Sequence, residues 1–238
     1  MAYQMTFKRY ELKYLLSKQE KEKILQGIAA YMKLDQYGRC TIRNIYFDTD
    51  NFRLIRRSLE KPVYKEKLRI RSYQPVGPED LVFVELKKKY KSVVYKRRLV
   101  LSEGEVMNSF NEETALPVQS QIGDEIEYFR KYYQHLHPSV FLSYEREAYY
   151  MKDGSDFRVT FDENILYRRE DFSLGSMIYG SPLLDKDQTL MEIKTSGGIP
   201  LWMSELLTKE HIYKTSFSKY GLAYKNIMTD KIQTGIYA

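Results

Sequence analysis

Charged and apolar side chains alternate with a period of two in several segments of this chain. The clearest case is the segment 64–73, where the charged residues Lys65, Lys67, Arg69 and Arg71 are interleaved with the apolar Leu68 and Ile70. Since successive side chains of a β-strand point to opposite faces, this pattern predicts a strand with one charged and one apolar face. Further strands are expected over 6–16, 41–48, 81–89, 92–101, 139–151, 156–162 and 189–195.

Segments with helical spacing of apolar residues lie between these strands. Ser17 and Glu20 form a capping-box motif before a helix whose apolar positions continue to Met32, and Ser102 and Glu105 form a second such motif. Other helices are expected over 50–59, 122–133, 200–210 and 217–227. No low-complexity linker or fixed-period repeat divides the sequence. The pattern therefore predicts a single domain over 1–238 with an α+β, mostly antiparallel fold.

The number of charged strand faces indicates where they point. A single charged face would be explained by contact with water. Here most of the expected strands have one, and their apolar faces are the surfaces that the helices need to cover. If helices cover the outside of a closed sheet, the charged faces line its interior, which would be a water-filled lumen. Lysine and arginine packed together destabilise a fold unless an anion neutralises them, so we expect a triphosphate or polyphosphate inside.

Positive charge is concentrated in one part of the chain. The net charge is +6, but residues 53–98 contain 15 Lys and Arg against 5 Asp and Glu, whereas residues 99–138 contain 2 against 7. Such a block points to an anionic partner. Nucleic acid is disfavoured as that partner, because alternating basic residues without an exposed aromatic platform are a poor match to single-strand binders.

Three glutamates, Glu11, Glu85 and Glu192, lie on the otherwise basic faces. Carboxylate oxygens are hard ligands, and a divalent ion that bridges carboxylate and phosphate is the usual arrangement for phosphoryl transfer. A metal-ligand role is expected first for Glu192, with Glu11 and Glu85 as further candidates. The alternative is that each glutamate forms an ion pair with a neighbouring lysine or arginine.

Composition excludes several classes of protein. Cys40 is the single cysteine, which rules out an intramolecular disulfide and a multi-cysteine zinc site. No apolar stretch approaches the ~20 residues of a membrane helix, and residues 1–13 contain no signal-peptide core. We therefore expect a cytoplasmic protein without a membrane span.

Short motifs in a fixed order along the chain resemble those of a known family. They are 7–14 (FKRYELKY), 45–49 (IYFDT), 68–73 (LRIRSY), 83–87 (FVELK), 144–146 (YER), 158–162 (RVTFD), 191–194 (MEIK) and 216–220 (SFSKY). Together they resemble the VTC domain, the polyphosphate polymerase module of the vacuolar transporter chaperone complex and its bacterial relatives. That domain belongs to the triphosphate tunnel metalloenzymes, the CYTH-like superfamily.

The resemblance implies a fold and a reaction. The implied fold is an antiparallel β-barrel of about eight strands that forms a tunnel, with helices packed outside. The implied reaction is transfer of the γ-phosphate of ATP to a growing polyphosphate chain, with Mn²⁺ or Mg²⁺ as cofactor. ATP and inorganic polyphosphate are thus the expected partners. The resemblance leaves open a membrane-protein partner, through which the chain would associate with a membrane.

The resemblance also implies roles for individual residues. The basic residues expected at the reacting phosphates are Lys13, Arg69, Arg71, Lys87, Lys96, Arg146, Arg158 and Lys219. Further substrate contacts are expected from Tyr144, Ser218, Lys194 and an arginine ahead of the Arg69 strand, for which Arg57 is chosen and Arg56 is the alternative. Glu192 is the implied metal ligand.

One position departs from the hydrolytic branch of the superfamily. Triphosphatases and cyclases begin with Glu-x-Glu-x-Lys, whereas this chain has Arg9, Glu11 and Lys13. The missing carboxylate would hold a second metal, so its absence disfavours hydrolysis and agrees with a polymerase. Two alternatives stay open: a triphosphatase of the same fold, and a non-catalytic protein that binds polyphosphate as an accessory subunit or sensor.

Overall fold

Eight antiparallel strands form a closed ring in this protein. A computed structural model describes residues 6–91 and 93–233, and of these the side chains of 6–9 and 233 are left undescribed. The ring consists of β1 (Thr6–Ser17), β3 (Cys40–Asp48), β4 (Tyr64–Ser72), β5 (Leu81–Tyr90), β6 (Val93–Ser102), β7 (His137–Met151), β8 (Phe157–Arg168) and β10 (Gln188–Thr195). Their order is β7-β3-β4-β5-β6-β1-β10-β8, and β8 pairs back with β7. The expected barrel is confirmed.

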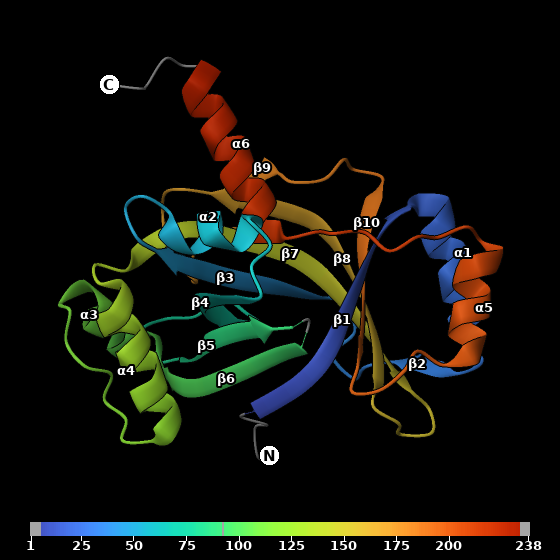
Figure 1. Cartoon of the computed structure of the whole chain (residues 1–238), viewed down its shortest axis with the longest axis horizontal. Coiled ribbons are helices and arrows are strands. Elements are labelled where there is room, and N and C mark those ends of the chain that lie inside the picture. Colours follow the sequence, from blue (N-terminus) through green and yellow to red (C-terminus); the bar gives the residue numbers. More distant parts are fainter. Residues whose placement is uncertain (1–5, 92, 234–238) are drawn as a thin grey trace.

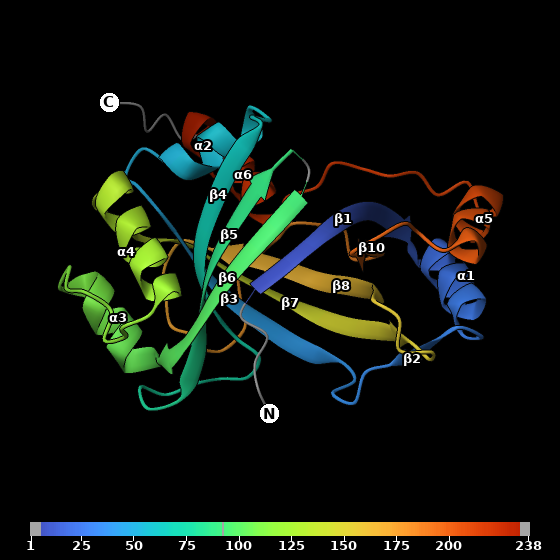
Figure 2. The same ribbon diagram turned by 60° about the horizontal axis from the view of Figure 1, so that its bottom comes forward.

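Strand β1 joins two parts of the ring. Its first residues, Thr6 to Arg9, pair with β6, and its remaining residues, Tyr10 to Ser17, pair with β10. Figure 2 shows β4, β5 and β6 side by side, with β1 continuing along the wall towards β10. Two short strands extend the sheet outside the ring: β2 (Met32–Leu34) pairs with β7, and β9 (Ser181–Pro182) pairs with β8.

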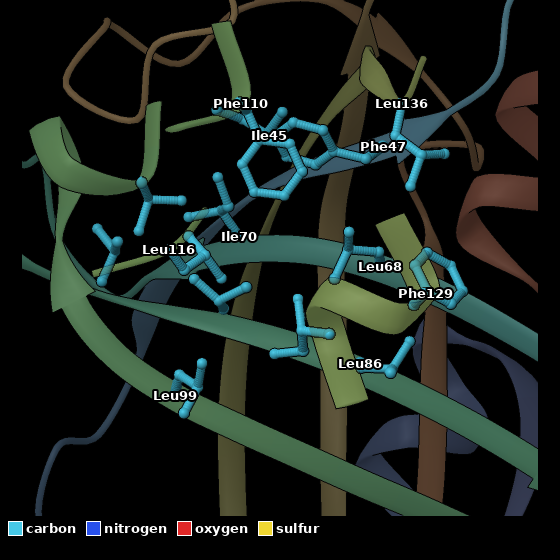
Figure 3. Packing of buried hydrophobic residues seen from close by; sticks show 14 of the residues in the cluster. Ile45, Phe47, Leu68, Ile70, Leu86, Leu99, Phe110, Leu116, Phe129 and Leu136 are labelled. Atoms are coloured by element: carbon cyan, nitrogen blue, oxygen red, sulfur yellow. The ribbon is translucent and has the colours of Figure 1, made fainter. Parts of the chain in front are cut away.

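Helices α3 (Glu103–Asn111) and α4 (Gln121–Tyr133) cover the outer face of β4, β5 and β6. The outward side chains of these strands are apolar, and Leu68, Val84 and Leu86 are fully buried in one cluster with Phe110 and Phe129 from the helices. Figure 3 shows this packing from close by. The apolar half of the alternating pattern is therefore the outer surface of the barrel.

Helices α1 (Lys18–Ile28) and α5 (Leu201–Lys209) pack against each other at the opposite end of the molecule (Figure 1). They cover outward residues of β1, β8 and β10, and this second cluster includes Tyr14, Phe161 and Met191. Ser17 caps α1 through a capping box with Glu20, as expected, and Ser102 caps α3 in the same way with Glu105.

Helices α2 (Arg53–Leu59) and α6 (Lys219–Gln233) lie together at the end of the barrel shown uppermost in Figure 1. Tyr220 and Ala223 of α6 are buried in a cluster with Leu142 and Leu190, which lie on the inward faces of β7 and β10. Helix α6 therefore closes one end of the barrel interior. Within the described ranges, none of the helices has the length and apolar character needed to cross a membrane.

Three boundaries differ from the sequence-based expectations. The first helix ends at Ile28 rather than near Met32, because Met32 begins β2. The last helix continues to Gln233. Strand β8 continues beyond residue 162 to Arg168, and its register with β7 shifts where Asn164 takes a positive φ of 48°. A bulge of this kind breaks the period of two, so alternation alone ends the strand too early.

Candidate functional site

The register of the strands gathers the charged side chains into rows on the inner surface, which we call the lumen. Residues directly opposite each other in antiparallel strands point to the same face. Arg69 of β4 lies opposite Glu85 of β5, which lies opposite Arg98 of β6. One step along, Lys67, Lys87 and Lys96 form a second row. The charged halves of three separate sequence patterns thus meet in one place.

Glu85 is the centre of the first row. Its side chain is fully buried, and Oε1 lies 2.6 Å from Arg98 and 2.5 Å from Lys96. Oε2 lies 2.8 Å from Arg69 and 3.8 Å from Arg71. Burial alone would raise the pKa of Glu85, but these four cations outweigh it and hold the pKa well below its usual range. Glu85 is therefore a permanent anion that keeps four cations in place.

A second centre is formed by Glu192 of β10. Its Oε2 lies 2.8 Å from Lys194 and 3.3 Å from Arg146, and its Oε1 lies 3.3 Å from Lys13 and 3.4 Å from Lys219. Lys13 and Glu192 are directly opposite in the β1–β10 register. The pKa of Glu192 is well below its usual range, since the surrounding lysines and arginine outweigh the effect of burial.

Asp162 of β8 completes the second centre, although the sequence analysis gave it no role. Arg146 binds it with two hydrogen bonds of 2.5 and 2.6 Å, and Lys219 donates to it as well. Asp162 is fully buried. Its position two residues after Thr160, on the inward face of the strand, was the available signal. The expected strand ends at residue 162, and the role of Asp162 depends on contacts with Arg146 and Lys219 from other segments.

Glu11 contacts a residue on a strand that does not pair with its own strand, so strand register does not predict the contact. It accepts a hydrogen bond of 2.7 Å from Lys87, although β6 lies between their strands β1 and β5. Burial tends to raise the pKa of Glu11, but Lys87, Lys194 and Lys13 outweigh it and lower the value to about 2. All three glutamates that were singled out as metal candidates are therefore ion-paired with lysine or arginine.

Two lumenal lysines of β4 bind no carboxylate among the described residues. Lys67 donates to Ser218 Oγ at 2.8 Å, and Lys65 donates to the backbone oxygen of Ser58 at 3.0 Å. Burial, followed by repulsion from Lys13 and Lys87, lowers the pKa of Lys67 well below its usual value. The pKa of Lys65 is lowered in the same sense by burial and by the neighbouring lysines. In this part of the lumen, lysines lie close together without a carboxylate of the described chain to pair with them.

The start of α6 reaches into the lumen. Besides Lys219, Ser218 accepts from Lys67, and the backbone oxygen of Phe217 accepts from Lys13 at 2.9 Å. Tyr220 anchors the segment, because its hydroxyl donates to Asp48 at 2.8 Å. The C-terminal helix thus contributes groups to the same charged surface as β1 and β4.

Two tyrosines line the cationic surface. The hydroxyl of Tyr144 accepts from Arg71 at 3.1 Å, and the Lys219 ammonium lies 4.5 Å from the centre of its ring. The hydroxyl of Tyr46 accepts from Arg69 at 2.8 Å. Arg69 and Arg71 together outweigh burial and lower the pKa of Tyr46. Tyr46 belongs to the quoted 45–49 motif but was not expected as a site residue.

Arg158 lies on the inward face of β8, opposite Lys194 of β10. Its Nε is buried without a hydrogen-bond partner in the described structure, and its guanidinium lies 4.6 Å from the ring centre of Tyr150. Burial lowers the pKa of Arg158. Lys194 donates to Thr160 Oγ1 at 3.4 Å in addition to its ion pair with Glu192.

Arg57 is the one candidate that the fold does not bring to the lumen. It is exposed on α2, and its charge acts on Tyr64 and Tyr133, which lie at the outer face of β4. Arg56, the alternative, is also exposed and donates to the backbone oxygen of Asn51 at 3.5 Å. Every other candidate lies on the inner surface of the barrel or at the start of α6.

The donor set of the lumen agrees with a metal that is held largely by its substrate. In the described part of the chain, no group of three or more His, Cys, Asp or Glu side chains is arranged to hold a metal ion. Mg²⁺ and Mn²⁺ are commonly bound by one or two carboxylates plus phosphate oxygens. Glu192 and Glu11 fit that requirement, because they lie on neighbouring positions of adjacent strands and their partners are mainly flexible lysines. Glu85 fits it less well, since it is fully enclosed by cations.

Solved structures with this architecture are known. A candidate adenylate cyclase from Bacillus halodurans has 17% identity and a TM-score of 0.59, with 90% of this chain and 96% of that chain covered. A candidate adenylyl cyclase from Hippeastrum, described as having a dominant triphosphatase activity, has 14% identity and a TM-score of 0.50, with coverages of 92% and 95%. At these identities the similarity shows the fold alone.

No curated protein matches the chain by sequence. A family model does match, and it extends over residues 8–228, which includes the ring of strands except the first two residues of β1, and most of α6. The chain therefore belongs to the VTC domain family.

Proposed function

We propose that this protein is a polyphosphate polymerase that transfers the γ-phosphate of ATP to the end of a polyphosphate chain inside the barrel. The observation that carries the proposal is the excess of fixed cations over carboxylates in the lumen. Glu85 and Glu192 each lie among four cations, and Lys65 and Lys67 bind no carboxylate of the described chain. A polyanion with closely spaced charges would neutralise this surface.

The ionisation of the carboxylates favours transfer to phosphate over hydrolysis. A general base that activates water is most effective when its pKa lies near the working pH. The pKa values of Glu11, Glu85, Asp162 and Glu192 are all lowered by neighbouring cations, which outweigh burial. These carboxylates are therefore poor proton acceptors. The terminal oxygen of a polyphosphate is already an anion and needs no base.

In the proposed step, that oxygen attacks the γ-phosphorus of ATP in line. The bond between the γ-phosphorus and the β–γ bridging oxygen breaks, so ADP leaves and the polymer gains one phosphate. Arg69, Arg71 and Lys96 would bind the non-bridging oxygens, and Glu85 holds these three side chains in position. Catalysis of this kind rests on positioning and on stabilisation of charge.

Glu192 and Glu11 are the residues that would hold Mn²⁺ or Mg²⁺ in this proposal. Such an ion supplies charge neutralisation at the phosphate oxygens. Lys13 and Lys194, which pair with Glu192, would be available to bind phosphate if this carboxylate held the metal, whereas Lys219 is also held by Asp162. Arg146 stays fixed by its two hydrogen bonds to Asp162.

A triphosphatase of the same fold is the second candidate function. A triphosphatase activity is described for the Hippeastrum protein, which has a similar fold. Against it, this chain has Arg9 where the hydrolytic motif has glutamate. The side chain of Arg9 lies outside the described residues. A non-catalytic polyphosphate-binding protein would share the cationic lumen but would not need Glu192.

The deciding experiment is incubation of the purified protein with ATP and Mn²⁺. A polymerase yields ADP and a ladder of polyphosphate on a gel, in amounts that match each other. Release of orthophosphate alone would identify a triphosphatase. Binding of polyphosphate without consumption of ATP would identify the non-catalytic alternative.

A matched pair of lysines on one strand serves as the control. Lys87 points into the lumen towards Glu11, whereas Lys88 points outward and pairs with Glu125 at 3.0 Å. Lys87→Gln should lower the rate of polymer synthesis, and Lys88→Gln should not. Equal effects of the two substitutions would mean that net charge, rather than the lumen, accounts for the activity.

A further inference from the structure

A second cationic site lies on the outer surface of the barrel, separated from the lumen by the sheet. Arg43 of β3 is directly opposite Ser72 of β4 on one side and Ser143 of β7 on the other. The three side chains point outward, since Ile45 and Phe47, which follow at the same spacing, pack with α3 and α4. We call this row of three residues the Arg43 recess.

Every member of the Arg43 recess has a buried polar atom without a partner. Arg43 is 7% exposed, Ser72 2% and Ser143 0%. Arg43 Nε, Ser72 Oγ and Ser143 Oγ have no hydrogen-bond partner in the described structure. Buried polar groups are almost always paired, because leaving one unpaired destabilises the fold. Three unpaired groups in one row therefore indicate that something outside the chain pairs with them.

The charge of the Arg43 recess identifies what that partner is. Burial and the nearby Arg168 both lower the pKa of Arg43, and no carboxylate opposes them. Glu145, one step further along β7, is already paired with Arg39 and accepts from Asn164. The missing partner is therefore negatively charged.

Arg168 is fixed beside the recess and cannot turn away. Its guanidinium donates to the backbone oxygens of Glu170, Asp171 and Tyr179, and it stacks 3.6 Å from the ring centre of Phe141. Phe141 is the outward residue next to Ser143 on β7. Arg168 also forms an ion pair with Asp171 at 3.3 Å, and these contacts hold its guanidinium in the environment of Arg43.

We infer that the Arg43 recess binds a small oxyanion of the size of phosphate, at a site distinct from the lumen. The guanidinium of Arg43 provides charge-assisted hydrogen bonds, and the hydroxyls of Ser72 and Ser143 flank it from both sides. Strand neighbours place their Cβ atoms about 5 Å from that of Arg43, so both hydroxyls lie close to the Arg43 side chain. This inference does not depend on the proposed function, because no lumenal residue takes part.

The test measures phosphate binding when binding in the lumen is weakened. The parent protein is Lys67→Met/Lys87→Gln, which lacks two lumenal cations, and the second protein adds Ser72→Ala and Ser143→Ala. The probe is inorganic phosphate, with chloride at equal ionic strength as the reference. We expect phosphate to raise the melting temperature of the parent, and the serine substitutions to weaken its affinity at least about tenfold. Equal affinities would overturn the inference.

A second measurement separates an anion from ordered water. If only water fills the recess, the serine hydroxyls are satisfied and their removal destabilises the phosphate-free protein, as Ser109→Ala should, because Ser109 Oγ donates to the backbone oxygen of Ala115. If the recess binds an anion instead, Ser72→Ala and Ser143→Ala remove unpaired hydroxyls, and the phosphate-free protein keeps or gains stability. Tungstate soaked into crystals should also give anomalous density between Ser72 and Ser143. Destabilisation together with an empty density map would refute the site.

Discussion

Lys87 of β5 and Glu11 of β1 form an ion pair of 2.7 Å across the width of β6. To make this contact, both side chains extend from their own strands across the inner surface of β6. It joins the basic wall formed by β4, β5 and β6 to the wall that contains Glu192. The two charged centres are therefore neighbouring parts of one continuous site.

Glu85→Gln should destabilise the ligand-free protein by about 3 kcal/mol, because it leaves four cations with one neutral partner in a buried position. Urea unfolding measures the change. Tripolyphosphate should restore much of the lost stability, since its charges replace the carboxylate. Glu125→Gln is the matched control, because Glu125 pairs with Lys88 and Arg97 on the outer surface, where such pairs contribute at most about 1 kcal/mol. A loss in Glu85→Gln no greater than in the control would contradict the role of Glu85.

Glu192→Gln should lower polymer synthesis by about 10²-fold or more, since the side chain keeps its size but loses the charge that would hold the metal. The measurement is the initial rate of ADP formation over a range of Mn²⁺ concentrations. Asp162, which holds Arg146 and Lys219 directly, should keep those two residues in place in the variant. An active variant with an unchanged dependence on Mn²⁺ would remove Glu192 from the metal site.

Lys67→Met should stabilise the ligand-free protein by about 1 kcal/mol, because Lys67 is repelled by neighbouring lysines and binds no carboxylate of the described chain. The same substitution should reduce the rise in melting temperature that tripolyphosphate causes. Melting curves of the variant and of Lys88→Met, with and without tripolyphosphate, measure both effects. If Lys67→Met lowered stability and left the response to tripolyphosphate intact, Lys67 would not belong to an anion site.

The lowered pKa of Lys67 also fixes the sign of a pH effect. In the unfolded chain lysine titrates near 10.4, so between the lowered folded value and about 10.4 the unfolded state binds more protons. The free energy of unfolding should therefore rise with pH across that window, by up to about 1.4 kcal/mol per pH unit for each such group. Lys67→Met should show a shallower rise. Polyphosphate binding should weaken over the same window, because it requires the lysine to take up a proton.

At low pH the lumenal carboxylates also make the free energy of unfolding rise with pH. The pKa of Glu11 is lowered to about 2, and those of Glu85, Asp162 and Glu192 are also lowered, while unfolded carboxylates titrate near 4. Their contribution to stability should be complete above the pKa of unfolded carboxylates and should be lost as the pH falls through the folded values, which for Glu11 is about 2. Unfolding measured by circular dichroism along this range tests the sign. Stability that is constant between pH 5 and 3 would contradict the ionisation of the lumen.

The architecture of the barrel could be predicted from sequence because alternation is a local property. The alternation within each strand predicts which of its faces is charged. In the fold those faces point inward, as Lys67, Glu85 and Glu192 illustrate. The eight-strand ring followed from resemblance rather than from the pattern. The wrong prediction for the end of β8 also has a local cause. The positive φ of Asn164 breaks the alternation there, so the pattern does not extend to the end of the strand.

Contacts between distant segments could not be predicted. Asp162 gains its importance only when Lys219 from the last helix reaches it, and Glu11 meets Lys87 only because the sheet closes. Arg57 shows the converse, since its sequence position beside a basic strand says nothing about the face of α2 on which it lies. The Arg43 recess could not be predicted for a related reason. Its serines have no distinctive sequence pattern, and only the strand register places them beside an arginine.

The division of β1 between two partners also determines when the ring can be completed during synthesis. Its first residues can pair only after β6 has been synthesised. Its remaining residues can pair only after β10, which is the last strand in the sequence. Until then β1 has an unpaired edge on a growing polypeptide, and such edges promote misassociation. Contacts between residues so far apart in sequence also slow folding. Ring closure is therefore the step at which a nascent chain of this family depends most on protection from its neighbours.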